Sequence, residues 1–232
     1  MKMEYVISTW DVPSLPILGA NARFPVRRIF CVGRNYVEHQ KEMGSDGREL
    51  PFFFIKSGHA LVAGGGDVHY PPMTENYHWE TEMVAVIGKN GARIPAEKAN
   101  EYVWGYAVGL DMTRRDLQQQ GKDQRRPWDF GKDFDEAAPV GAITPAAKIG
   151  HPAKGRIRLT VNGEVKQDAD IAEMIWSVPE QIAFLSQYYT LEAGDIIMTG
   201  TPAGVGKAKV GDELVAAVAG LGELRVKITA PR

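Results

Sequence analysis

The residues whose types and spacing most clearly indicate a chemical role are two glutamates, Glu80 and Glu82, separated by one threonine. They directly precede the apolar run Met83–Gly88, which is typical of a buried β-strand. Because side chains two positions apart on a strand point the same way, both carboxylates would face one side of it. Neighbouring carboxylates repel each other and destabilise a strand, and a divalent cation bound between them removes that repulsion.

A third carboxylate, Asp111, follows a second predicted strand, Val103–Leu110. One face of this strand carries the small residues Gly105, Ala107 and Gly109, which leaves room for something to approach closely. If the two strands are neighbours, three carboxylates converge, and such an all-oxygen set selects Mg²⁺ or Mn²⁺ over softer metals. The alternative is that the three acids are solvated residues at strand ends, and the local sequence leaves both interpretations open.

His39 and Glu42 form a second candidate pair, three positions apart in a short helix predicted from Asn35 to Gly44. This spacing places both side chains on one helix face. A carboxylate beside an imidazole raises its basicity and fixes its tautomer, as a general base requires. An ordinary surface pair on a solvated helix face is the alternative.

The glycine-rich segment Met198–Lys207 follows a predicted strand and resembles a phosphate-binding loop at first sight. However, the spacing from Gly200 to Gly206 is one residue too long for that motif, and Ala208 stands where a hydroxyl residue should bind Mg²⁺. The backbone N–H groups of the segment could still bind an anion, with Thr201 adding its hydroxyl. A plain glycine-rich turn is the alternative.

These residues need a scaffold, and the patterning predicts mainly short strands with few helices. Asn162-Gly163 indicates a tight hairpin, and Ser177 with Glu180 forms a capping box that begins a helix with apolar residues at helical spacing. Another helix could begin at Thr113 and Asp116. The expected fold class is mostly β with a few helices, an α+β domain. Strands are expected at Tyr5–Thr9, Arg28–Val32, Phe52–Lys56, Met83–Gly88, Val103–Leu110, Arg156–Val161, Glu164–Gln167 and Asp195–Thr199, with two more in Glu213–Ile228.

The composition is that of an ordinary globular protein: 232 residues, 44% hydrophobic and 24% charged, with a net charge of -2. We expect an N-terminal arm over residues 1–25 and one catalytic domain over residues 26–232. The single cysteine, Cys31, excludes an intrachain disulfide and favours a reducing compartment, so we expect a cytoplasmic protein. No signal peptide is visible. The sequence has no apolar stretch of the roughly 20 residues that span a membrane, and its charge does not suit nucleic acid. A small molecule is the expected partner.

Several short motifs follow one another from about residue 26 to the end of the chain, and each is weak alone. As an ordered set they resemble the fumarylacetoacetate hydrolase family, and residues 109–118 with 125–134 resemble its acylpyruvate hydrolase branch. One departure is Trp79, where relatives often have a histidine. The motifs are Phe30–Tyr36, Phe53–Lys56, Glu80–Glu82, Gly105–Asp111, Thr113–Gln118, Val161–Gly163 and Gly194–Pro202.

The resemblance implies a mixed β-sandwich roll, usually a homodimer, and assigns roles to the residues that match. It implies that Glu80, Glu82 and Asp111 bind Mg²⁺ or Mn²⁺. His39 and Glu42 would be the catalytic dyad on a closing lid, and Lys132 the lysine near the metal. The matched substrate-binding positions are Arg115, Gln118 and Thr201, with Gly200 in the loop that would hold the substrate carboxylate.

The implied activity is metal-dependent hydrolysis of a C–C bond in a 2,4-diketo acid, in aromatic catabolism. Fumarylpyruvate or a related acylpyruvate would give pyruvate and a carboxylic acid such as fumarate. The alternatives with the same metal site are oxaloacetate decarboxylation and isomerisation of a 2-hydroxyhepta-2,4-diene-1,7-dioate. Arg34, Arg125 and Arg126 are candidates for binding a second substrate carboxylate.

Overall fold

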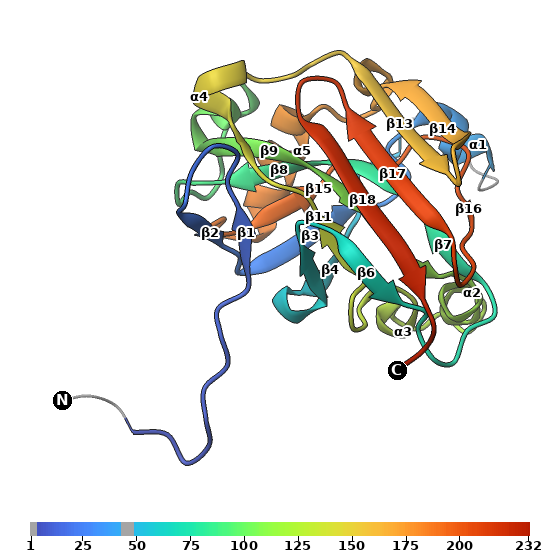
Figure 1. The fold of residues 1–232 in the computed structure, drawn as a ribbon. Coiled ribbons are helices and arrows are strands. Elements are labelled where there is room, and N and C mark those ends of the chain that lie inside the picture. The colour runs from blue at the N-terminus through green and yellow to red at the C-terminus, as the bar shows by residue number, and fades with distance from the viewer. Residues whose placement is uncertain (1–3, 43–48) are drawn as a thin grey trace.

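The computed structural model of the chain describes residues 4–42 and 49–232, without the side chains of residues 40–42. Its largest sheet has eight strands, and the strands predicted from long apolar runs lie at its centre (Figure 1). Across the sheet the order is β4, β3, β15, β8, β9, β11 and β5, and β12 also pairs with β9. The bounds are β3 Arg28–Val32, β4 Phe53–Ser57, β5 Leu61–Ala63, β8 Thr81–Ile87, β9 Val103–Leu110, β11 Ala138–Val140, β12 Thr144–Pro145 and β15 Ile196–Met198.

A second sheet of five strands packs on one face of the first, in the order β14, β13, β17, β18 and β6. Asn162 and Gly163 join β13 to β14 with φ angles of 52° and 82°, as the predicted hairpin requires. The bounds are β6 Gly66–His69, β13 Arg156–Val161, β14 Glu164–Asp170, β17 Glu213–Val218 and β18 Gly222–Thr229.

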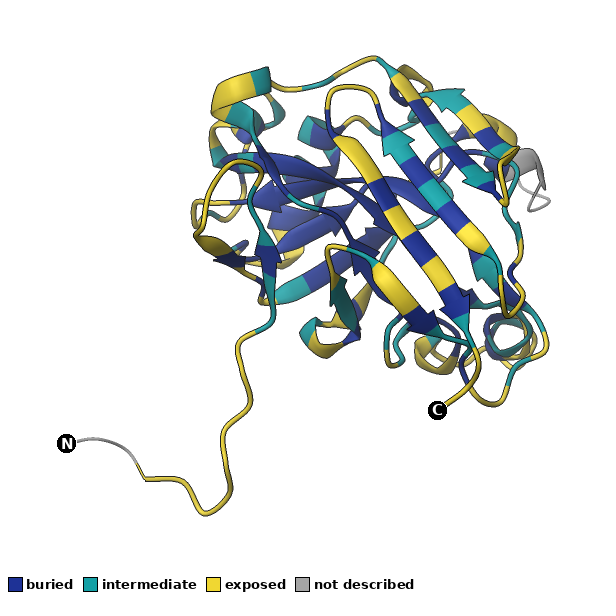
Figure 2. Cartoon of the chain, in the orientation of Figure 1, coloured by how far each residue is buried: buried dark blue, intermediate teal, exposed yellow. Residues whose placement is uncertain are grey.

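The central strands of the eight-stranded sheet, β3, β15, β8, β9 and β11, are buried on both faces, as Figure 2 shows by their dark blue colour, whereas the edge strands β4 and β5 are partly exposed. Along β8, Met83 and Ala85 enter the core between the two sheets, whereas Val84 and Val86 enter a second core on the opposite face. β17 and β18 alternate between buried and exposed positions, because only one face of the second sheet is covered. The mostly-β, α+β fold class is confirmed.

Two small sheets and the helices complete the chain. The helix predicted by the capping box of Ser177 and Glu180 is present as α5. None of the described helices has the length and apolar character needed to cross a membrane. The small sheets contain β1 Ser14–Pro16 with β2 Arg23–Pro25, and β10 Thr113–Arg114, β7 Tyr77–Trp79 and β16 Gly206–Lys207. The helices are α1 Val37–Glu42, α2 Arg115–Asp123, α3 Asp129–Lys132, α4 Ala146–Ile149 and α5 Val178–Tyr188, with 3₁₀ turns η1 Gly58–Ala60, η2 Ala96–Tyr102 and η3 Ile171–Glu173.

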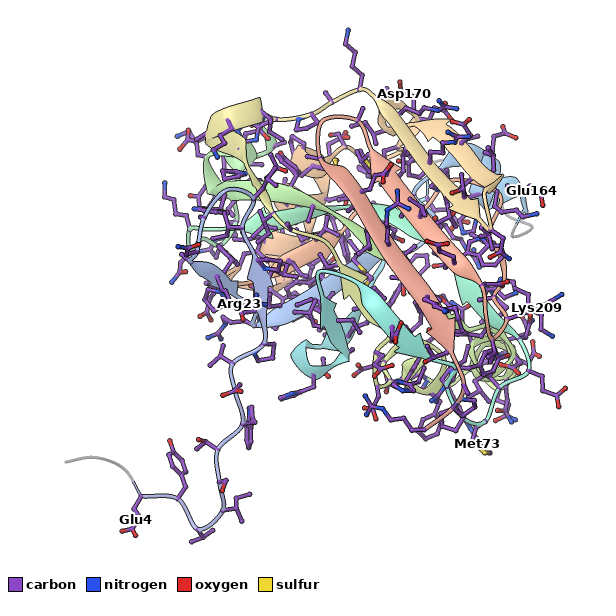
Figure 3. The ribbon with its side chains drawn as sticks, viewed as in Figure 1. Glu4, Arg23, Met73, Glu164, Asp170 and Lys209 are labelled. Carbon is purple, nitrogen blue, oxygen red and sulfur yellow. The ribbon has the colours of Figure 1, made fainter. Side chains whose placement is uncertain are left out.

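The strand predicted at Tyr5–Thr9 is wrong. Residues 4–12 run away from the body as an exposed arm, with Glu4 at its far end (Figure 3), and no described strand pairs with them. An apolar pattern alone does not form a strand without a neighbour to bond with. The β1–β2 hairpin that follows does pack on the body, and Leu15 and Phe24 enter the second core. The division into an arm and a catalytic domain stays a prediction.

One further expectation about local structure needs correction. The helix expected from Thr113 begins at Arg115 as α2, because Thr113 pairs with His78 in a small sheet. The close approach expected at the small residues of β9 is present, and it is made by neighbouring atoms of the protein. A β-carbon on Gly109 would lie 2.7 Å from a methyl group of Val84, so core packing fills that space.

Candidate active site

Three carboxylates meet where β8 and β9 lie side by side. Glu82 on β8 is opposite Gly109 on β9, and the backbone N–H of Asp111 donates to the carbonyl of Glu80 at 2.9 Å. One carboxylate oxygen from each of Glu80, Glu82 and Asp111 lies within 4.8 Å of the others, and all three residues are buried. The predicted convergence of the three acids is therefore present.

Lys132 and Arg115 bring positive charge to this cluster. Lys132 Nζ donates to Glu80 Oε2 at 2.7 Å, to Asp111 Oδ2 at 2.8 Å and to Thr113 Oγ1 at 2.7 Å. Arg115 donates a hydrogen bond from Nη2 to Glu80 Oε1 and one from Nη1 to Gln118 Oε1 at 2.6 Å. The two cations therefore hold Glu80 and Asp111 in fixed positions.

A fully buried lysine, Lys56, supports the backbone that carries these residues. Its Nζ donates to the carbonyl of Met112 at 3.0 Å and to that of Lys132, so it joins the end of β9 to α3. It also lies 2.9 Å from Asp111 Oδ1 as a charge contact without hydrogen-bond geometry. Sequence reasoning gave Lys56 no role, although a lysine in the apolar run Phe52–Lys56 was a usable signal.

The three carboxyl groups differ in pKa because their neighbours differ. Burial alone would raise the pKa of Glu80, but the charges of Lys132 and Arg115 hold it well below its usual range. Burial raises the pKa of Glu82 well above its usual range, and the charges of Asp111 and Glu80 raise it further. The neighbouring cations thus do not neutralise the negative charge around Glu82.

The loop after β15 is tied to the cluster through Gly200. Its N–H donates to Glu82 Oε2 at 2.8 Å, and its φ of +102° is one that glycine adopts without strain. Asn35 donates to the carbonyl of Thr199 at 2.8 Å and so anchors the same loop. Gln167 donates to Thr201 Oγ1 at 2.9 Å. Sequence reasoning gave Asn35 only a possible helix-capping role and Gln167 none, since their partners are 164 and 34 positions away along the chain.

Most of the predicted site residues line one pocket. Gly200 lies beside it through its bond to Glu82. His39 is buried at 5% exposure on α1, whereas the side chain of Glu42 lies outside the described residues, as does Gly44. The predicted residues that line the pocket are His39, Glu80, Glu82, Asp111, Arg115, Gln118, Lys132 and Thr201.

The donor set fits a hard divalent cation. All three candidate ligands are buried carboxylates, and Asp111 Oδ1 accepts no hydrogen bond from the part of the chain that the structure describes. A cation among them would offset the repulsion that raises the pKa of Glu82. Oxygen-only ligation selects Mg²⁺ or Mn²⁺, which are the cofactors that Glu80, Glu82 and Asp111 would hold.

This fold and site define an enzyme that holds a divalent metal through carboxylates. Residues 28–229 match the family model described as fumarylacetoacetate (FAA) hydrolase C-terminal. The chain belongs to the fumarylacetoacetate hydrolase family.

Relatives with stated activities are similar over most of their length. A fumarylpyruvate hydrolase from Ralstonia is 47% identical over 180 residues, which are 78% of this chain and 93% of that protein. A mitochondrial oxaloacetate tautomerase from Homo sapiens is 42% identical over 205 residues, 88% of this chain and 93% of the other. The crystal structure of fumarylpyruvate hydrolase from Pseudomonas aeruginosa in complex with Mn²⁺ and pyruvate superposes with a TM-score of 0.96 at 48% identity, covering 98% of this chain and 100% of that one.

Proposed function

We propose that this protein is a Mg²⁺- or Mn²⁺-dependent hydrolase that cleaves fumarylpyruvate, or a related acylpyruvate, to pyruvate and a carboxylic acid. The observation that carries the proposal is the carboxylate triad in one pocket with His39 and Lys132. The Pseudomonas relative that holds Mn²⁺ and pyruvate supports it.

Held by Glu80, Glu82 and Asp111, the cation would supply a Lewis acid for the keto-acid oxygens of the substrate. Lys132 and Gln118 stabilise the negative charge that develops on the carbonyl oxygen under attack. Burial alone would lower the pKa of Lys132, but the charges of Asp111 and Glu80 raise it, so Lys132 stays charged. The Oε1 atom of Gln118 is taken by Arg115, which leaves its amide nitrogen to donate to the substrate.

His39 is the proposed general base. It takes a proton from a water molecule, and the resulting hydroxide attacks the C4 carbonyl of the diketo acid. The C3–C4 bond then breaks: C4 leaves as the carboxylic acid, and the electron pair stays on the pyruvate fragment, which takes a proton at C3. Glu42 keeps its predicted role of orienting His39.

Thr201 and the loop that contains Gly200 are proposed to bind the carboxylate at the pyruvate end. Gln167 donates to Thr201 Oγ1, so the hydroxyl proton of Thr201 is left to donate into the pocket. A hydroxyl donor and backbone N–H groups in a glycine-rich loop suit a carboxylate ligand.

The proposal is tested by measuring pyruvate release from fumarylpyruvate with Mg²⁺ present, for the wild type and for His39→Ala. We expect His39→Ala to lower kcat by about 10²-fold or more, as loss of a general base does, with unchanged metal affinity. His59→Ala is the matched control, because His59 contacts the ring of Trp10 on the arm. Turnover by His39→Ala within a factor of two of wild type contradicts the assignment of the base.

The second candidate function is tautomerisation of oxaloacetate, which the 42% identical human relative supports. It needs proton transfer at the same pocket and no attacking water. An assay with oxaloacetate separates the possibilities: a tautomerase speeds enol–keto exchange without forming pyruvate, whereas a decarboxylase forms pyruvate and CO₂.

Three broader expectations remain proposals: a homodimer, a cytoplasmic location and a role in aromatic catabolism. The resemblance to acylpyruvate hydrolases supports the first and the third, and the single cysteine, Cys31, supports the second. Light scattering on the purified protein at micromolar concentration tests the first, and a mass near 51 kDa, twice the chain mass of 25.5 kDa, is the expected result.

A further inference from the structure

The pocket contains two cations that the proposed mechanism does not use, Arg34 and Lys122. Both side chains are half-buried. Neither forms a hydrogen bond or an ion pair with any residue that the structure describes, in contrast to Arg115 and Lys132. Partly buried cations without an acidic partner are costly, and a bound anion offsets that cost.

The two cations lie on a pair of contacting aromatic rings. Phe52 and Trp128 meet edge to face with ring centroids 5.6 Å apart. The guanidinium of Arg34 is 5.9 Å from the centroid of Phe52, and Lys122 Nζ is 5.1 Å from the centroid of Trp128. The rings therefore hold both positive charges in one part of the pocket.

The backbone beside Arg34 is shaped for this arrangement. A β-carbon on Gly33 would lie 2.1 Å from a ring atom of Phe52, so only glycine lets the ring approach so closely. Arg34 itself has a φ of 54°, in the left-handed region that side chains other than Gly, Asn and Asp rarely adopt.

The charges around Lys122 also favour an anion-binding position beside Lys122 and Arg34. Burial, together with the charges of Arg115 and Arg34, lowers the pKa of Lys122 to about 8. This arrangement of like charges favours an anion close to both side chains. The other two arginines considered from sequence do not line the pocket, and Arg126 lines a separate cavity with Phe130.

We propose that Arg34 and Lys122 bind the second carboxylate of the substrate, so that the enzyme prefers acylpyruvates that end in a carboxylate. The rings of Phe52, Phe54 and Trp128 contact the carbon chain between the two ends of the substrate. This inference rests on the proposed function and specifies its substrate class.

The test compares fumarylpyruvate, which ends in a carboxylate, with acetylpyruvate, which ends in a methyl group. Lys122→Met keeps an apolar stem on Trp128, and Arg34→Gln replaces the guanidinium of Arg34 with a shorter, neutral amide. We expect each variant to lose roughly 10- to 100-fold in kcat/KM for fumarylpyruvate, through KM, the loss typical of one charged hydrogen bond. The value for acetylpyruvate is expected to stay within a factor of about two, and Arg34→Lys is expected to keep most of the preference.

Arg126→Gln is the matched control, because it removes one positive charge near the pocket without touching its lining. Thermal unfolding of each variant confirms that it folds. In an active enzyme, equal loss with both substrates, or no loss with either, overturns the inference and leaves the proposed function intact. Absence of pyruvate from both substrates with the wild type overturns the proposed function instead.

Discussion

Glu80 and Glu82 are chemically similar side chains two positions apart, yet the fold gives them opposite properties. Glu80 accepts hydrogen bonds from Lys132 and Arg115, whereas Glu82 accepts one from a backbone N–H and faces two other carboxylates. The pKa of Glu80 is lowered and that of Glu82 is raised. In the proposed metal site, Glu82 is therefore the carboxylate at which a proton would compete with the metal.

This difference predicts how metal affinity depends on pH. A raised pKa means that the metal-free protein keeps a proton on Glu82 to a higher pH, and the cation binds the deprotonated form. Affinity for Mg²⁺ is therefore expected to rise with pH, with release of a proton on binding. Calorimetry in two buffers of different ionisation enthalpy measures that proton. Binding without proton release across pH 5 to 8 contradicts the assignment, and Glu82→Gln is expected to remove the release and weaken binding.

At the residue scale, the sequence predicted which side chains form the site and which way they point better than it predicted their hydrogen-bond partners. The period of a strand was enough to place Glu80 and Glu82 on one side, and Asp111 followed from its position after β9. Lys132 came only from the family resemblance, because the four residues of α3 carry no periodic signal. The three hydrogen bonds of Lys132 depend on the packing of α3 against β4 and β10, which local sequence does not encode.

At the scale of elements, the loop after β15 connects the three carboxylates, Glu80, Glu82 and Asp111, to the rest of the fold. A β-carbon on Gly200 would lie 2.5 Å from the β-carbon of Asn35. The side-chain amide of Asn35 in turn donates hydrogen bonds to the carbonyl groups of Thr199 and Trp176. The loop is therefore fixed from both sides, and with it the N–H that reaches Glu82.

Gly200→Ala is expected to destabilise the protein by about 2–3 kcal/mol, from backbone strain and the clash with Asn35 together, and to weaken Mg²⁺ binding. Gly211→Ala is the matched control, since Gly211 has a similar φ of +95° and no neighbouring atom within 4 Å. It is expected to cost only about 1 kcal/mol of backbone strain. Urea unfolding and calorimetry measure both quantities. Equal effects from the two substitutions would show that the contact with Asn35 does not matter.

Elements with a strong local signal were predictable, and those that depend on distant partners were not. The turn at Asn162 and Gly163 and the capping box before α5 are determined by a few adjacent residues. By contrast, the β1–β2 hairpin was missed, because its short strands are stabilised by burying Leu15 and Phe24 against the second core. The same reasoning explains why residues 5–9, with no partner strand among the described residues, stay irregular and exposed.

At the scale of the whole molecule, the doubly covered sheet is the rigid support of the site. β8 and β9 are buried on both faces, with Glu82 on β8 and with Glu80 and Asp111 directly next to the two strands, and α1, α2 and α3 bring His39, Arg115 and Lys132 to the same pocket. The exposed arm takes no part in this arrangement, and the family match begins after it, at residue 28.

Two truncations separate the exposed arm from the packed hairpin. Removal of residues 1–11 is expected to leave the free energy of unfolding and kcat nearly unchanged, because residues 4–11 are exposed. Removal of residues 1–25 exposes the core that Leu15 and Phe24 cover, at an expected cost of about 3 kcal/mol or more. Urea unfolding of both truncated proteins measures the difference, and equal stability of the two contradicts the packing described for the hairpin.

In the proposed reaction, acylpyruvate cleavage depends on a cation held by Glu80, Glu82 and Asp111. The most direct measurement is pyruvate release from fumarylpyruvate by metal-stripped enzyme as Mn²⁺ or Mg²⁺ is added back. We expect negligible release without the cation, saturation at one bound ion per chain, and loss of the response in Glu82→Gln. Pyruvate release that persists at the full rate after chelation, or a full response to the cation in Glu82→Gln, would contradict it.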